Sequence, residues 1–103
     1  MAEEKSLLST IIDSPIEEVD AILKEGKFSI TVLTNLKKGL ELQYQRVTYT
    51  KDGIVQGIKN KSYDNMTEAE NTLKNLYVAL QLIEDRAKLI QQYINDLKVD
   101  FRN

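Results

Sequence analysis

The amino-acid sequence predicts an all-α protein, a helical hairpin or bundle with one long C-terminal helix. The main basis for this prediction is a set of eleven apolar residues. Their spacing alternates between three and four residues without a break, as in helices packed along a common seam. We call this set the seam: Met66, Ala69, Leu73, Leu76, Leu80, Ile83, Ala87, Ile90, Ile94, Leu97 and Phe101. In addition, no proline or glycine lies between Thr67 and Asp100. Shorter helical patterns precede the seam, so we expect one helical domain over residues 1–103.

The first 25 residues predict two short helices, at 4–12 and 15–25. Apolar residues at helical spacing indicate the first helix: Leu7, Leu8, Ile11 and Ile12. Ser14 and Glu17 resemble a capping box, and Pro15 between them suits the first position of a helix. Gly26 predicts the end of the second helix, because glycine readily adopts the left-handed conformation found there.

The middle of the chain predicts a helix at about 29–46, followed by a loop or ribbon over 47–65. Apolar spacing from Leu33 to Val47 fits a helix, although Gly39 costs about 1 kcal/mol relative to alanine. Residues 47–50 are strand formers, residues 51–53 suit a turn, and residues 54–58 suit a returning strand. For residues 47–59 the sequence leaves open a small β-ribbon, an irregular loop or a continuation of the helix.

The C-terminal third predicts a helix at about 67–100, a rod of roughly 50 Å. Thr67 and Glu70 stand three apart, as in a capping box at its start. A second apolar stripe beside the seam predicts more than one neighbouring helix: Ala79, Leu82, Leu89 and Tyr93. The helix at 29–46 would fold antiparallel onto this rod, with the N-terminal helices across one end. Because the rod is about twice as long as that partner, part of the seam would lack an internal partner.

Composition argues against catalysis. The chain has no cysteine and no histidine, so thiolate nucleophiles, histidine acid–base chemistry and Cys/His zinc sites are excluded. Grouped carboxylates such as Glu17 and Glu18, or Glu68 and Glu70, fall in the first turns of predicted helices, where the helix dipole favours negative charge. We therefore expect no enzyme activity, no catalytic or metal-binding residues, no cofactor and no small-molecule substrate.

The seam predicts a non-enzymatic module for protein–protein interaction. Such a module would self-associate or dock into a larger assembly, as an adaptor, a scaffold, a chaperone-like protein or a virion component. Its partner would be a second copy of the chain or another helical protein. The predicted interface combines seam residues with the second stripe: Leu73, Leu76, Leu80, Ile83, Ile90, Ile94, Leu97, Leu82, Leu89 and Tyr93.

A small nucleic-acid-binding or regulatory protein is the alternative. Residues 1–20 have a net charge of −5, whereas residues 37–61 have a net charge of +4. Basic and aromatic side chains together suit phosphates and stacked bases. The same positive segment also suits an acidic partner, such as the N-terminus of a neighbouring copy. The candidate contacts are Lys37, Lys38, Tyr44, Arg46, Tyr49, Lys51, Lys59, Lys61 and Tyr63.

The sequence also predicts a cytoplasmic location, or a virion location if a phage encodes the chain. No apolar run approaches the roughly 18 residues of a membrane span, so we expect no membrane partner. The start of the chain is acidic, unlike the basic start of a secretory signal. A chain without cysteine also fits a reducing compartment.

Overall fold

The computed structural model describes the backbone of residues 2–102 and the side chains of residues 7–99. Within this range the chain forms four helices and no strand. The helices are α1 (Ala2–Asp13), α2 (Ile16–Gly26), α3 (Ile30–Lys59) and α4 (Met66–Arg102). The predicted all-α class, with its long C-terminal helix, is confirmed.

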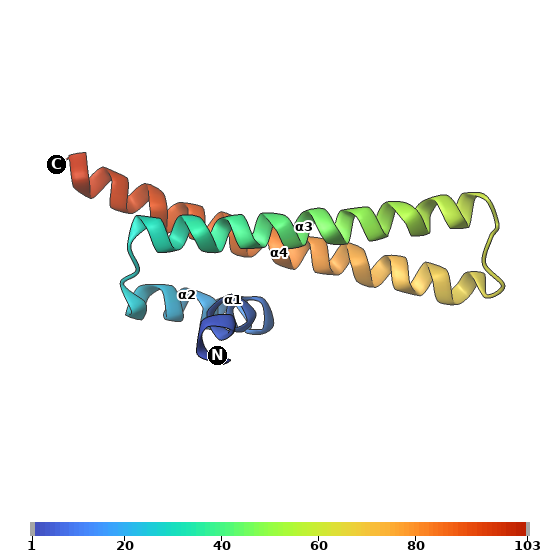
Figure 1. Cartoon of the computed structure of the whole chain (residues 1–103), viewed down its shortest axis with the longest axis horizontal. Coiled ribbons are helices and arrows are strands. Elements are labelled where there is room, and N and C mark those ends of the chain that lie inside the picture. The colour runs from blue at the N-terminus through green and yellow to red at the C-terminus, as the bar shows by residue number, and fades with distance from the viewer. Residues whose placement is uncertain (1, 103) are drawn as a thin grey trace.

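The two long helices, α3 and α4, form an antiparallel hairpin closed by the loop at 60–65 (Figure 1). The short helices α1 and α2 lie on one side of the hairpin, toward the end that is remote from the loop. The molecule measures 58 × 29 × 23 Å and has a radius of gyration of 17.0 Å. A compact chain of this length has a radius of gyration of about 13 Å. The fold is therefore elongated, with a two-helix arm extending from a four-helix end.

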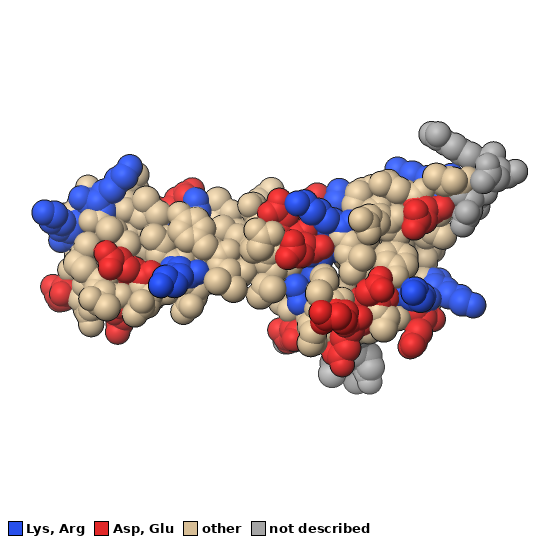
Figure 2. Space-filling view, turned by 180° about the vertical axis from the view of Figure 1, so that it is seen from behind, with Lys and Arg blue, Asp and Glu red and all other residues tan. Residues whose placement is uncertain are grey.

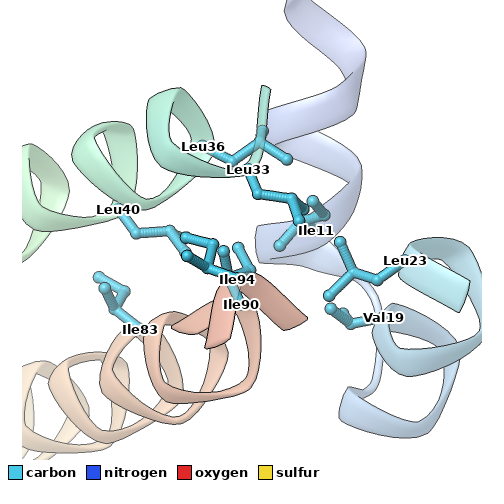
Figure 3. Packing of buried hydrophobic residues seen from close by; sticks show 9 residues of the cluster. All are labelled: Ile11, Val19, Leu23, Leu33, Leu36, Leu40, Ile83, Ile90 and Ile94. Carbon is cyan, nitrogen blue, oxygen red and sulfur yellow. The ribbon is translucent and has the colours of Figure 1, made fainter. Parts of the chain in front are cut away.

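The hydrophobic core lies at the four-helix end. Nine buried residues from all four helices meet there (Figure 3): Ile11, Val19, Leu23, Leu33, Leu36, Leu40, Ile83, Ile90 and Ile94. Along the arm, α3 and α4 have only each other as neighbours. Of the seam residues on the arm, Ala69 and Leu80 are buried, whereas Leu73 and Leu76 are half-buried. α1 and α2 therefore cover the hairpin at the four-helix end only.

The structure corrects the expected end of the central helix. α3 continues to Lys59, so residues 47–59 form neither a β-ribbon nor a loop. Val47 and Ile54 are half-buried and continue, at seven-residue spacing, the row that Leu40 belongs to. Packing of this row against α4 outweighs the strand preference of residues 47–50, because propensity is the weaker effect.

This longer α3 also removes the predicted mismatch in helix length. α3 has 30 residues and α4 has 37, so the expected twofold difference is wrong. Ten of the eleven seam residues are buried or half-buried within the chain's own fold. The side chain of the eleventh, Phe101, lies outside the described residues. Length excess therefore does not argue for association.

The helix ends differ from the predicted capping pattern. α4 begins at Met66, and the Asn65 side-chain oxygen accepts a hydrogen bond from the Glu68 amide at 3.0 Å, so the cap is not Thr67. α2 has no side-chain cap at its start. At its end Lys27 adopts the left-handed conformation, with φ 48°, while Gly26 remains in the helix. The Phe28 ring occupies the space that a Cβ atom at Gly26 would need.

Candidate interaction surface

Arg86 holds α1 against the hairpin. Its side chain is only 4% exposed, and its guanidinium donates hydrogen bonds to three backbone carbonyls. Nε donates to Ile11 at 2.7 Å, a second nitrogen donates to Leu82 at 3.0 Å, and the third donates to Ser14. Two of these carbonyls lie at the C-terminal end of α1, where carbonyls lack helical partners and the helix dipole favours a cation. A buried charge is thereby paired with a helix end.

Tyr93 holds α2 in a similar way. Its hydroxyl donates to the Asp20 carboxylate at 2.6 Å and lies 3.2 Å from the Asp20 carbonyl oxygen. This hydrogen bond to a carboxylate, together with burial, raises the pKa of Tyr93 to about 12. Tyr93 and Arg86 lie seven residues apart on α4, so they share one edge of that helix. The short helices are therefore fixed along a single edge of α4.

On α3 the matching edge carries Gly39. The Leu8 side chain of α1 lies directly over this glycine, where a Cβ atom would come within 2.9 Å of a Leu8 methyl group. Arg46 and Gly53 follow Gly39 at steps of seven residues and therefore share its edge. On α4, Ala79 and Thr72 likewise precede Arg86 at steps of seven. The hairpin face that α1 covers thus continues along the arm.

Beyond α1 no helix of the described chain covers this face, and near the loop the Tyr63 ring lies over Gly57 of α3. A hollow of about 220 Å³ lies where α1 ends, lined by Ile12, Val47 and Leu82 among others. Nearer the loop a second hollow, of about 360 Å³, is lined by Ile54, Glu68 and Thr72 among others. We call the uncovered surface the open face. It comprises the two edge rows and the exposed residues beside them: Arg46, Gly53, Glu68, Thr72, Asn75, Ala79 and Leu82.

The open face carries little charge. Of these residues, Arg46 and Glu68 are charged and of opposite sign, and Asp64 of the loop also lines the second hollow. Leu82 is 46% exposed, and no atom lies within 4 Å of the position of a Cβ at Gly53. In Figure 2, viewed from behind, the middle of the arm likewise shows few charged side chains. The charged side chains gather near the loop and at the four-helix end.

Most of the predicted interface residues are buried or half-buried within the chain's own fold. Leu80, Ile83, Ile90 and Ile94 are buried, and Leu73, Leu76, Leu89 and Leu97 are half-buried. Tyr93 bonds to α2. Leu82 is the one member of this predicted set that is exposed. Any surface offered to a partner therefore lies beside the seam rather than along it.

The candidate nucleic-acid contacts do not come together. They spread along α3 from Lys37 to Lys59, about 33 Å at 1.5 Å per residue, and continue into the loop. Lys37 pairs with Glu41 at 3.5 Å, and Lys51 pairs with Asp52 at 2.7 Å. The remaining members lie on several sides of the helix or in the loop: Lys38, Tyr44, Arg46, Tyr49, Lys59, Lys61 and Tyr63. Acidic residues share the loop end of the hairpin with Lys59 and Lys61: Asp64, Glu68 and Glu70.

The environment of Lys51 illustrates this dispersal. Its ammonium group lies over the Tyr77 ring of α4, 5.9 Å from the ring centre. The hydrogen bond to Asp52 raises the pKa of Lys51. Lys51 lies on the other side of the row of Leu40, Val47 and Ile54 from Gly53, so Lys51 and its neighbour Tyr77 lie on the edge of the hairpin opposite the open face. One of the basic side chains is thus engaged within the fold.

Sequence reasoning missed Arg86 as a structural residue. A usable signal was present, because arginine is rare in this lysine-rich chain and Arg86 directly precedes a seam residue, Ala87. Arginine suits a buried site better than lysine, since its planar group presents five donors in fixed directions.

The remaining structural features and the comparisons with known proteins do not assign a function. Among the described residues, no group of His, Cys, Asp or Glu side chains is placed to hold a metal ion. In the same part of the chain, no helix is both long and apolar enough to span a membrane. No protein-family model, curated protein or solved structure matches the chain.

Proposed function

We propose that the protein is a non-enzymatic helical module for protein–protein interaction, and that it self-associates or docks into a larger assembly through the open face. The main observation behind this proposal is that α1 and α2 cover the hairpin at one end only. α1 and α2 cover one face at the four-helix end, and no described helix covers the same face along the arm. A pair of helices alone buries only the seam between them, so a further helix on this face would also cover Leu82 and the half-buried Val47 and Ile54.

Surface area supports the same proposal. The chain exposes 7449 Å², whereas a compact protein of 11.8 kDa exposes about 5,900 Å². The elongated shape therefore leaves about 1,500 Å² more surface exposed, and a partner on the open face would cover part of it.

Charge supports an interaction with protein more than one with nucleic acid. The centre of a protein interface is depleted in charged residues, as the open face is. A nucleic-acid site instead needs several cations arranged along a phosphate backbone, whereas the lysines here are dispersed and partly paired. The absence of cysteine supports action in a reducing compartment such as the cytoplasm.

Two lysine substitutions test this proposal. Leu82→Lys places a charge on the open face, and Val78→Lys places the same charge on the outward side of α4. Leu82 is 46% exposed and Val78 is 55% exposed, so both variants should fold. Sedimentation velocity between 1 and about 200 µM should show association of the wild type and of Val78→Lys, with at least about tenfold weaker association of Leu82→Lys. Equal effects of the two substitutions would place the interface elsewhere.

A further inference from the structure

We propose that the hollow where α1 ends is a binding site for a small carboxylate with a short apolar chain, and that Arg86 holds the carboxylate. This proposal goes beyond the interaction through the open face and does not depend on it. Three features of the hollow support it: a buried cation without a counter-ion, spare hydrogen-bond donors on that cation, and apolar walls around a small volume.

Arg86 is a buried cation that forms no ion pair. Its side chain is 4% exposed, and none of the ion pairs among the described residues includes it. Its three acceptors are neutral backbone carbonyls, two of which belong to the C-terminal end of α1 and offset the charge only in part. Buried charges are ordinarily paired with an opposite charge, because their removal from water is costly. A carboxylate beside Arg86 would complete such a pair.

The guanidinium group also has spare donors. An arginine side chain carries five N–H groups, and Arg86 uses one from each of its three nitrogens. Nη1 and Nη2 each keep a second N–H group that has no acceptor among the described residues. Arg86 lines the hollow, so a carboxylate bound there lies next to this group. The planar guanidinium matches the geometry of a carboxylate better than that of other small anions' partners such as lysine.

The rest of the hollow suits an apolar chain. Gln43 is the other polar residue of its lining, and no acidic residue lines it. Its volume of about 220 Å³ exceeds the roughly 150 Å³ of a cavity that holds benzene, so a chain of about six carbons fits. The lining holds no nucleophile and no acid–base group, so the carboxylate would be a bound ligand rather than a substrate. Apolar side chains form the walls: Ile12, Val47, Ala79, Leu82 and Ile83.

The combination of a buried cation and apolar walls selects one chemical class. A neutral alcohol would fill the walls but would leave Arg86 without a counter-charge. An alkylamine would place a second cation beside Arg86, and acetate would leave the apolar walls in water. A carboxylate with a chain of about six carbons satisfies both parts of the hollow, because discrimination among ligands depends on the groups that each one leaves unpaired.

Hexanoate is the probe that tests the proposal, with 1-hexanol and acetate as matched controls. In a ¹H–¹⁵N NMR titration of the full-length chain, hexanoate should bind with a millimolar Kd and shift the amides of Ala79, Leu82 and Arg86 most. Each control lacks one half of the ligand and should bind at least about tenfold more weakly. No binding of hexanoate up to about 20 mM, or equal binding of hexanoate and 1-hexanol, would overturn the proposal.

Ala79→Leu tests the location of the site. The half-buried Ala79 lines the hollow, so a leucine there fills the space and leaves the hydrogen bonds of Arg86 in place. Ala21→Leu, the same substitution at an exposed position of α2, is the control. Ala79→Leu should weaken hexanoate binding at least about tenfold, whereas Ala21→Leu should leave it unchanged. Binding of hexanoate to Ala79→Leu as tight as to the wild type would overturn the site, whether or not the chain associates through the open face.

Discussion

At the scale of the residue, Arg86 contributes most to fixing the N-terminal helices. Replacing it with alanine leaves the carbonyls of Ile11 and Ser14 without their donors and opens a cavity beside the core. We expect Arg86→Ala to lower the free energy of unfolding by about 2–4 kcal/mol. Urea denaturation followed by circular dichroism measures this change.

Lys88→Ala is the matched control for Arg86→Ala. Lys88 is exposed and its pair with Glu84, at 3.7 Å, lies on the surface, so its loss should cost less than about 0.5 kcal/mol. If both alanine variants unfold at the same urea concentration, Arg86 does not hold α1 in the way the hydrogen bonds indicate.

Tyr93 predicts a pH dependence of stability. Its pKa is about 12 in the folded chain and about 10 in an unfolded one, so above pH 10 the unfolded chain loses the phenol proton first. The stabilisation is therefore complete below pH 10 and is lost as the pH rises from about 10 to 12. Tyr93→Phe has no phenol proton, so its unfolding free energy should fall less steeply over that range. Parallel pH profiles for the two proteins would contradict this assignment.

Residue-scale features were also the hardest to predict from the sequence. Thr67 and Asn65 are both acceptable helix caps, and the pattern favoured Thr67 because Glu70 completes a capping box. The chain instead starts α4 at Met66, which lets this residue join the packed seam. Neither Arg86 nor the hydrogen bond between Tyr93 and Asp20 follows from local spacing. Both contacts join residues more than 70 positions apart, so they depend on how α1 and α2 return to α4.

At the scale of the element, the continuous α3 is the feature that changes the fold most. A proline at Gln56 tests it, because proline inside a helix costs about 3 kcal/mol whereas a loop tolerates it far better. We expect Gln56→Pro to lower the free energy of unfolding by about this amount relative to Gln56→Ala, which removes the same exposed side chain. The measurement is again urea denaturation. Equal stability of the two variants would mean that residues 47–59 are not held as a helix.

The reason for the mistaken boundary is physical. Val47, Thr48, Tyr49 and Thr50 are strand formers, and Gly53 weakens a helix, so local preference pointed away from α3. The row of Leu40, Val47 and Ile54, at seven-residue spacing, indicates the longer helix. This row stabilises a helix only when α4 packs against it along the same length. By contrast, the seam of α4 was predicted correctly because five heptads of apolar residues outweigh any local ambiguity.

At the scale of the whole molecule, the uneven distribution of the core explains both the shape and the proposed interaction. Four helices share one core at one end, and the arm beyond has only two. The sequence predicted association from the seam itself, which the chain covers with its own α3. The open face instead lies beside the seam, on the flank of the hairpin that α1 covers at the four-helix end. Its extent depends on where α1 ends against the hairpin, which local sequence patterns do not give. The surface proposed for a partner therefore came from the packing of α1, not from the seam.

The most direct test of this proposal is the molar mass of the wild-type chain by light scattering, measured from about 1 to 200 µM. The chain has a mass of 11.8 kDa. If the open face binds a second copy, the measured mass will rise with concentration toward twice this value and level off there, as a closed two-fold dimer requires. A mass that stays at 11.8 kDa across the whole range would contradict self-association through the open face.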